Sequence, residues 1–215
     1  MLSCVRSQKK MENRRGSWYT YKERLRFDRS ERTYAMKNIL FIGTGGTIAS
    51  EMSDGALSPA LTAAQLLHHI PEVSDICRVD AVQLFTLDST DITPTHWLRI
   101  ADEIINNYDR YDGFVIAHGT DTLAYTAAAL SYLIQNSRKP IVITGAQKPI
   151  GFDTTDSKQN LTDSFICAAS GLSGVLVVFG GHVLLGTRAR KTRTKSFSAF
   201  SSPNYPPLAT VQNGR

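Results

Sequence analysis

The fold is decided by the stretch Ile39-Leu40-Phe41-Ile42-Gly43-Thr44-Gly45-Gly46-Thr47-Ile48, and the stretch Phe114-Val115-Ile116-Ala117-His118-Gly119-Thr120-Asp121-Thr122 repeats its plan. Each begins with apolar residues only, which is typical of a strand buried on both faces, and continues into a glycine-bearing turn that leads toward a helix. Open α/β sheets build their binding sites beyond the carboxyl ends of such strands. We therefore expect the threonines of the two turns and the carboxylate of Asp121 to lie at one site.

Outward from these stretches, strand-like apolar runs alternate with helical patterns. A cap residue followed by proline marks two helix starts, at Ser58-Pro59 and at Thr93-Pro94. Apolar strands separated by helices predict a parallel sheet covered on both faces. The sequence thus predicts a three-layer, doubly wound α/β fold with a mainly parallel sheet, with strands at 39–42, 79–87, 114–117, 141–144 and 175–179 and helices at 59–70, 94–108, 123–134 and 161–169.

The charge of the chain is distributed unevenly. The net charge is +5, yet residues 1–36 hold ten Lys and Arg against four Asp and Glu, and the remaining 14 basic and 15 acidic residues give −1. A nucleic-acid-binding fold carries its positive charge on the folded part, so we expect no nucleic-acid partner. We interpret residues 1–36 as a basic leader, either disordered or an upstream extension of the true start, with a transit peptide as the functional alternative.

The compartment is also predicted from composition. The first 36 residues contain no apolar run long enough for a signal peptide or a membrane span, so we expect no membrane association. The three cysteines, Cys4, Cys77 and Cys167, show neither disulfide nor metal spacing. Such sparse cysteines fit a reducing environment, and we expect a cytoplasmic protein.

The first turn has three interpretations. Gly43 and Gly45 begin a dinucleotide fingerprint, but Ile48 occupies its third glycine position and no acidic residue follows about twenty positions later, where a ribose contact is required. A purely structural turn is the second interpretation. In the third, the glycines admit a small substrate to the backbone between Thr44 and Thr47, where free N–H groups receive a developing oxyanion.

The second turn is equally open. Asp121 or Thr122 could cap the helix that begins near Leu123. We interpret His118 as a hydrogen-bonded core residue rather than a base, and the chain lacks a Gly-x-Ser-x-Gly nucleophile elbow. Thr120 and Asp121 are better candidates for chemistry, because a threonine hydroxyl reacts near neutral pH only when another group takes its proton.

Together, in this order, the two stretches resemble the two signatures of the bacterial-type L-asparaginase family. The resemblance covers about residues 37–213, which we take as one catalytic domain, and leaves the leader outside it. Further segments match the family pattern: Leu87-Asp88-Ser89-Thr90-Asp91, Thr144-Gly145-Ala146, 156–161, 186–191 and Ser202-Pro203-Asn204-Tyr205.

The resemblance implies hydrolysis of the small molecule L-asparagine to L-aspartate and ammonia, without metal or organic cofactor. It implies that Thr47 attacks the side-chain amide to form an acyl-enzyme, and that Thr120, Asp121 and Lys191 form a supporting triad in which Lys191 manages the threonine proton. It also implies a substrate pocket in which Ser89 meets the α-carboxylate and Asp121 the α-ammonium, the full set being Asp88, Ser89, Thr90, Thr120, Asp121 and Ala146. Family members form homodimers or homotetramers.

Two departures from the family pattern temper these expectations. A tyrosine on the loop after the first signature assists the nucleophile in many members, and the comparable position here is Ala56. The family's smaller C-terminal domain is missing, because the chain ends at Arg215, and residues 214–215 would be the cut end of its linker. We therefore expect little or no turnover. The alternatives are a glutamine-specific or tRNA-linked amidohydrolase, and a non-catalytic fragment that binds an amino acid or a homologue.

Overall fold

The computed structural model describes residues 11–12, 18–19, 36–53 and 56–212. The chain divides into two units, Met1–Ala35 and Met36–Arg215. In the first unit, β1 (Met11–Glu12) pairs antiparallel with β2 (Trp18–Tyr19). Most of the leader, and the last two residues of the expected linker, lie outside the described residues.

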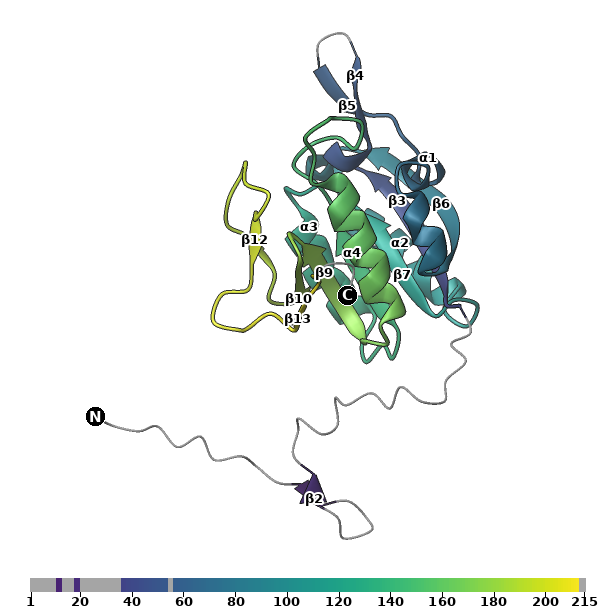
Figure 1. Ribbon diagram of the computed structural model, residues 1–215, viewed down its shortest axis with the longest axis vertical. Helices are drawn as coiled ribbons and strands as arrows, with labels where there is room; N and C mark the ends of the chain where they lie inside the picture. Colours follow the sequence, from purple (N-terminus) through teal and green to yellow (C-terminus); the bar gives the residue numbers. More distant parts are fainter. Residues whose placement is uncertain (1–10, 13–17, 20–35, 54–55, 213–215) are drawn as a thin grey trace, which may run out of the picture. The chain divides into compact units, whose positions relative to one another are not determined.

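The second unit contains a seven-stranded sheet (Figure 1). Its strands, in spatial order, are β13 (Ala209–Thr210), β10 (His182–Leu185), β9 (Gly174–Phe179), β8 (Pro140–Thr144), β7 (Gly113–Ala117), β3 (Asn38–Gly45) and β6 (Arg78–Leu87). The five strands from β9 to β6 are parallel, as predicted, and β10 and β13 add an antiparallel edge that was not expected from the sequence.

Helices cover both faces of this sheet. In Figure 1, α4 (Ser157–Ala169) crosses the near face, and α1 (Ala63–Leu67) packs on that face as well. The opposite face is covered by α2 (Pro94–Asn106) and α3 (Leu123–Leu133). The predicted three-layer α/β fold is therefore confirmed.

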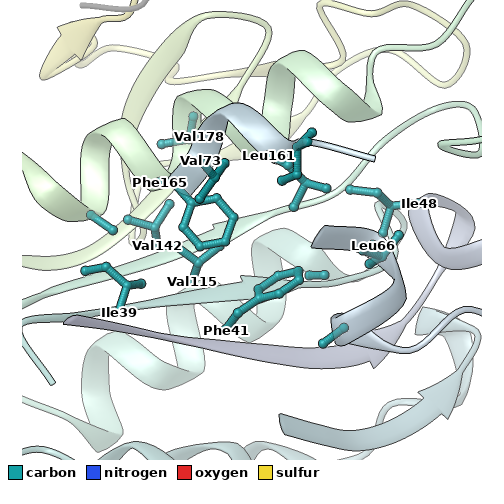
Figure 2. Close-up of a cluster of buried hydrophobic side chains, with 14 of the residues drawn as sticks. Ile39, Phe41, Ile48, Leu66, Val73, Val115, Val142, Leu161, Phe165 and Val178 are labelled. Atoms are coloured by element: carbon teal, nitrogen blue, oxygen red, sulfur yellow. The ribbon is translucent and has the colours of Figure 1, made fainter. Parts of the chain in front are cut away.

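Two hydrophobic clusters hold the layers together, because successive strand residues point to opposite faces. Figure 2 shows the cluster beneath α4, where the rings of Phe41 and Phe165 meet edge to face with centroids 5.4 Å apart. The neighbouring strand residues Leu40 and Ile42 point the other way and join the cluster beneath α2 and α3. Both clusters continue to the ends of the strands and thereby hold the turns that follow.

The helix predicted over 59–70 is wrong. Ser58 and Pro59 belong to β5 (Ala56–Pro59), which pairs antiparallel with β4 (Ser50–Ser53) in a hairpin that projects at the top of Figure 1. The helix begins instead after Thr62, whose hydroxyl accepts from Gln65 N while Gln65 Oε1 accepts from Thr62 N, at 3.3 and 2.9 Å. This reciprocal capping box overrides the proline signal. After α1 the chain makes a 3₁₀ segment, η3 (Pro71–Asp75).

The other helix boundaries agree with prediction to within a few residues. Thr93 caps α2 with proline at its first position, as expected. α4 begins four residues earlier than the predicted 161, because Ser157 and its neighbours extend the helix toward the carboxyl end of the sheet. That extension places polar residues of α4 beside the turns that carry the candidate site.

Candidate functional site

The two signature turns touch backbone to backbone. Gly46 has a φ of +78°, and a Cβ built on it would lie 2.3 Å from Gly119 N. Only glycine fits such a contact, since any side chain would overlap the opposing backbone. Thr47 and Thr120 each directly follow one of these glycines, so the contact brings the two threonine-bearing turns to one place at the carboxyl ends of β3 and β7.

Thr47 begins a single 3₁₀ turn, η2 (Thr47–Ala49). Ala49 N and Ser50 Oγ both donate to Gly46 O, at 3.0 and 3.1 Å, and fix the path of the chain. Ile48 is fully buried in the core, whereas Thr47 is half-buried. The turn therefore leaves Thr47 partly accessible on a backbone that two hydrogen bonds hold in place.

Thr44, the other threonine of the first turn, has a structural position. Its hydroxyl donates to Ala117 O at 2.8 Å and is 2% exposed. This bond links the end of β3 to the end of β7. Of the two threonines that bracket the glycines, only Thr47 remains available to a substrate.

Thr120, Asp121 and Lys191 are brought together as the resemblance implies. Lys191 lies on β11 (Arg190–Lys191), which pairs antiparallel with β12 (Phe200–Ser201). Its Nζ donates to Thr120 Oγ1 at 2.7 Å and to Asp121 Oδ1 at 2.6 Å. The lysine side chain is 15% exposed and that of Asp121 is 60% exposed, so the triad lies at the rim between core and solvent. A lysine in direct contact with a threonine hydroxyl can exchange a proton with it.

His118 is a core residue, which confirms the interpretation from sequence. It is fully buried, and its Nδ1 lies 2.7 Å from Gly119 O while its Nε2 lies 2.9 Å from Thr126 Oγ1. Because a carbonyl oxygen only accepts, we assign the proton to Nδ1, so Nε2 accepts from Thr126, which in turn accepts from Trp97 Nε1 at 2.9 Å. Burial lowers the pKa of His118 to about 4 and keeps the ring neutral. Both nitrogens are occupied, and neither serves as a base.

The second turn begins α3 with Thr122 at the cap position, but no side-chain capping bond forms there. The Thr122 hydroxyl instead donates to Ser89 O at 2.6 Å. Ser89 is 2% exposed and packs against Gly119, where an added Cβ would lie 2.7 Å from Ser89 Oγ. Ser89 therefore lies directly beside the turn that carries Thr120.

Asp88 and Thr90 bond to each other. Asp88 Oδ1 accepts from Thr90 N at 2.8 Å and from Thr90 Oγ1 at 2.7 Å, which caps the short 3₁₀ turn η4 (Ser89–Asp91). Both side chains are exposed. Their observed bonds shape the loop that presents Ser89, and a direct contact with substrate stays a prediction.

Ala146 follows β8 and is 1% exposed, with its side chain in the cluster beneath α4. A contact between Ala146 and a substrate stays a prediction. Ala56, at the position of the family's tyrosine, lies in β5 and pairs with Ser53. The sequence predicts a loop without a tyrosine here, and the structure instead shows a hairpin, whose first strand follows the turn that carries Thr47.

A groove of about 800 Å³ lies against the triad. Asp121 and Tyr125 line one side of it, and the basic stretch that holds Lys191 lines the other with Arg188, Arg190 and Arg193. Among the described residues no cluster of three or more His, Cys, Asp or Glu is arranged to hold a metal ion. In the same part of the chain, no helix has the length and apolar character needed to cross a bilayer.

Comparison with known proteins places this geometry in one family. The family model described as "Asparaginase, N-terminal" matches residues 38–215. An L-asparaginase of Thermococcus kodakarensis is 40% identical over 179 residues, which cover 81% of this chain and 53% of that protein. One of the subunits of the glutamyl-tRNA(Gln) amidotransferase of Pyrococcus abyssi is 39% identical over 186 residues, which cover 82% of this chain and 42% of that protein.

The fold of the chain also agrees with that of a solved structure. The solved structure of the thermostable L-asparaginase from Thermococcus kodakarensis superposes with a TM-score of 0.75 at 38% identity and covers 83% of this chain and 55% of that one. The chain thus spans about half the length of the relatives it matches. Relatives named as an L-asparaginase and as an amidotransferase subunit match at similar identity.

Proposed function

The chain belongs to the asparaginase family, and on that premise we propose that it hydrolyses the side-chain amide of L-asparagine to L-aspartate and ammonia. The observation that carries this proposal is the single ammonium of Lys191, which donates to Thr120 Oγ1 at 2.7 Å and to Asp121 Oδ1 at 2.6 Å beside the turn of Thr47. A threonine-bearing turn packed against the turn of a proton-handling pair fits acyl transfer.

The reaction runs in two halves. Thr47 Oγ1 attacks the amide carbon, and the backbone N–H groups of the glycine turns stabilise the oxyanion that forms. The proton of Thr47 passes through the Thr120–Lys191 pair to the leaving nitrogen, which departs as ammonia and leaves an acyl-threonine. Water then adds to the acyl carbon and returns a proton to Thr47, which releases aspartate.

The same residues account for recognition of an amino acid. The carboxylate of Asp121 faces the α-ammonium, and its 60% exposure leaves it open to a ligand beside Lys191. Ser89 Oγ, packed against Gly119, donates to the α-carboxylate. Asp88, Thr90 and the backbone of Ala146 complete the pocket. The basic groove beside the triad adds a positive field that favours an anionic end of the substrate.

A second candidate is an amidohydrolase acting on glutamine or on an amide linked to tRNA. The observation that favours it is the 39% identity to the Pyrococcus abyssi amidotransferase subunit, which equals the likeness to an Escherichia coli L-asparaginase 1. One methylene separates asparagine from glutamine and changes discrimination by about 1–3 kcal/mol. A direct comparison of substrates distinguishes the candidates.

The deciding experiment measures ammonia release from L-asparagine and from L-glutamine. We expect at most slow ammonia release from asparagine, and we expect Thr47→Ala and the isosteric Thr120→Val to abolish it. The matched control is Thr162→Val, which removes a hydroxyl on α4 that bonds Glu72 instead. Faster release from glutamine supports the second candidate. Amino-acid binding by calorimetry without any ammonia shows a non-catalytic binding protein and overturns both.

We also propose a cytoplasmic location and assembly into a homo-oligomer. The described cysteines, Cys77 and Cys167, are buried free thiols, and burial raises their pKa values to about 11 and about 12. Thiols kept protonated in this way are compatible with a reducing compartment. Fractionation of cells and light scattering of the purified chain test the two statements.

A further inference from the structure

One buried amide on α4 connects the two segments that form the triad. Asn160 is 1% exposed, and its side chain bonds to three other residues. Its Nδ2 donates to Gly145 O at 2.9 Å and to Asp156 Oδ2 at 3.2 Å, and its Oδ1 accepts from Gly180 N at 3.0 Å. Gly145 follows β8 and Gly180 follows β9, so a single side chain holds the loops of two neighbouring strands.

The bond from Asn160 Nδ2 to Gly145 O affects the position of Thr120. A Cβ built on Gly145 would lie 2.3 Å from His118 O and 3.3 Å from Thr120 Cγ2, so the Gly145 backbone packs directly against the methyl group of Thr120. A β-branched side chain has few χ1 choices, and a methyl group held on one side directs the hydroxyl to another. Here the hydroxyl meets Lys191. The position of Gly145 therefore selects the Thr120 rotamer.

Asp156 binds the loop of residues 145–148 as well. It is 6% exposed, and its carboxylate accepts from Gln147 N at 3.0 Å to each oxygen and from Lys148 N at 3.2 Å. A buried carboxylate with several backbone donors is satisfied without a cation. Asp156 and Asn160 thus act together as a clamp on residues 145–148.

The bond from Gly180 N to Asn160 Oδ1 affects the position of Lys191. A Cβ on Gly180 would lie 2.9 Å from Phe197 O, so the turn that Asn160 holds supports the segment entering β12. Thr192 N donates to Ala199 O at 2.8 Å, and β12 pairs with β11, which carries Lys191. These contacts, from Gly180 through β12 to β11, set the position of Lys191.

The contacts through Gly145 end at Thr120 and those through Gly180 end at Lys191. These two end points touch, because Lys191 Nζ and Thr120 Oγ1 lie 2.7 Å apart. We propose that Asn160 is a positioning residue that sets the Thr120–Lys191 contact by holding Gly145 and Gly180 at once. This inference rests on the proposed function only for its kinetic consequence. Asn160 touches no reacting atom; it acts through the loops that place two groups that do.

The test compares Asn160→Leu, which keeps the shape and removes all three bonds, with Ser164→Ala on the same helix. Ser164 is fully buried, and its hydroxyl bonds the helix backbone at Asn160 O, at 2.6 Å. In ammonia release from L-asparagine we expect kcat of Asn160→Leu to fall roughly 10- to 100-fold, because small misplacements of reacting groups have effects of that order. We expect KM to change less than about threefold, and Ser164→Ala to stay within about twofold of the unaltered chain.

Hydrogen exchange of residues 118–122, 144–148 and 190–192 separates this inference from the proposed function. Faster exchange in all three segments of Asn160→Leu, and not of Ser164→Ala, supports the positioning role even if the unaltered chain releases no ammonia. If Asn160→Leu does not fold, Asn160→Asp retains the acceptor for Gly180 N and loses the donor to Gly145 O, so residues 144–148 should loosen first. Unchanged exchange in these segments, or unchanged kcat in an active chain, overturns the inference.

Discussion

The two signature turns have the same plan in the sequence and different surroundings in the structure. The turn after β3 presents Thr47 half-buried on a 3₁₀ turn beside a projecting hairpin. The turn after β7 holds Thr120 at 6% exposure between the Gly145 loop and Lys191. Thr47 is partly accessible to solvent, whereas Thr120 is held by its protein neighbours. This difference fits a nucleophile in the first turn and a proton-handling group in the second.

The largest expected effect tests the contact between the turns. Gly46→Ala places a Cβ 2.3 Å from Gly119 N at a φ of +78°, so the two turns must separate. We expect a loss of at least about 3 kcal/mol in the free energy of unfolding, measured by urea titration, together with loss of ammonia release. Gly151→Ala is the matched control, since no atom lies within 4 Å of its added Cβ. Equal stability of the two variants contradicts the packing of the turns.

The second test removes the partner that distinguishes the turn of Thr120. Lys191→Met keeps the length of the side chain and deletes the ammonium, and we expect kcat to fall by about 10²- to 10⁴-fold. Lys158→Met, at an exposed lysine of α4 that does not line the groove, is the control and should keep most of the activity. The unfolding free energy should change by less than about 1 kcal/mol, because Asp121 is 60% exposed and solvent screens the ion pair. Equal kcat for both variants removes the lysine from the mechanism.

The third test concerns the buried histidine beneath the second turn. The folded chain holds the pKa of His118 at about 4, below its ordinary value of 6.5. A depressed histidine pKa stabilises the fold fully above pH 6.5, and this stabilisation is lost as the pH falls toward 4, since only the unfolded chain binds the proton in that window. We expect a slope of about 1.4 kcal/mol per pH unit from this group.

Urea titrations between pH 7 and pH 4.5 measure that slope. In His118→Gln, which does not titrate, the contribution of this residue should disappear and the pH dependence should become shallower by the same amount. An identical slope in both proteins shows that the buried ring does not govern acid stability.

The smallest expected changes in stability come from the two threonines of the first turn. Thr44→Val leaves Ala117 O without its buried donor and should lower the unfolding free energy by about 1 kcal/mol, with activity largely kept. Thr47→Val should show the opposite result, with stability within about 0.5 kcal/mol and ammonia release abolished. Thermal unfolding and the ammonia assay on the same preparations provide both measurements. Loss of activity in Thr44→Val alone reverses the assignment of the nucleophile.

Much of the fold follows from local pattern. Four of the five parallel strands were predictable because their central residues are almost all apolar, and only β6 interrupts its apolar residues with Asp80 and Gln83. The start of α2 was predictable because Thr93 and Pro94 are a strong helix signal. The helix predicted from Ser58 and Pro59 failed, since the same two residues also fit the end of a strand, and the choice was made by pairing with β4. The antiparallel strands β10 and β13 are short and gain their identity from neighbours in the sheet.

The sequence also predicted only part of the candidate site. The sequence predicted Thr120 and Asp121 as site residues because they are adjacent in one turn. Lys191 is 71 residues from Thr120, and it was predicted only from the resemblance to the family. No pattern in the sequence indicates that Asn160 bonds to loops 15 and 20 residues away. Such bonds depend on which strands become neighbours.

The sequence by itself determined the alternation of buried strands and helices, and the two glycine turns that carry Thr47 and Thr120. These features are local, since burial pattern and backbone freedom act within a few residues. Only the tertiary structure decided that Gly46 packs on Gly119, that Lys191 reaches Thr120, and that Asn160 holds both sides of that contact. Those distances depend on the order and twist of the sheet, which no single segment of the chain contains.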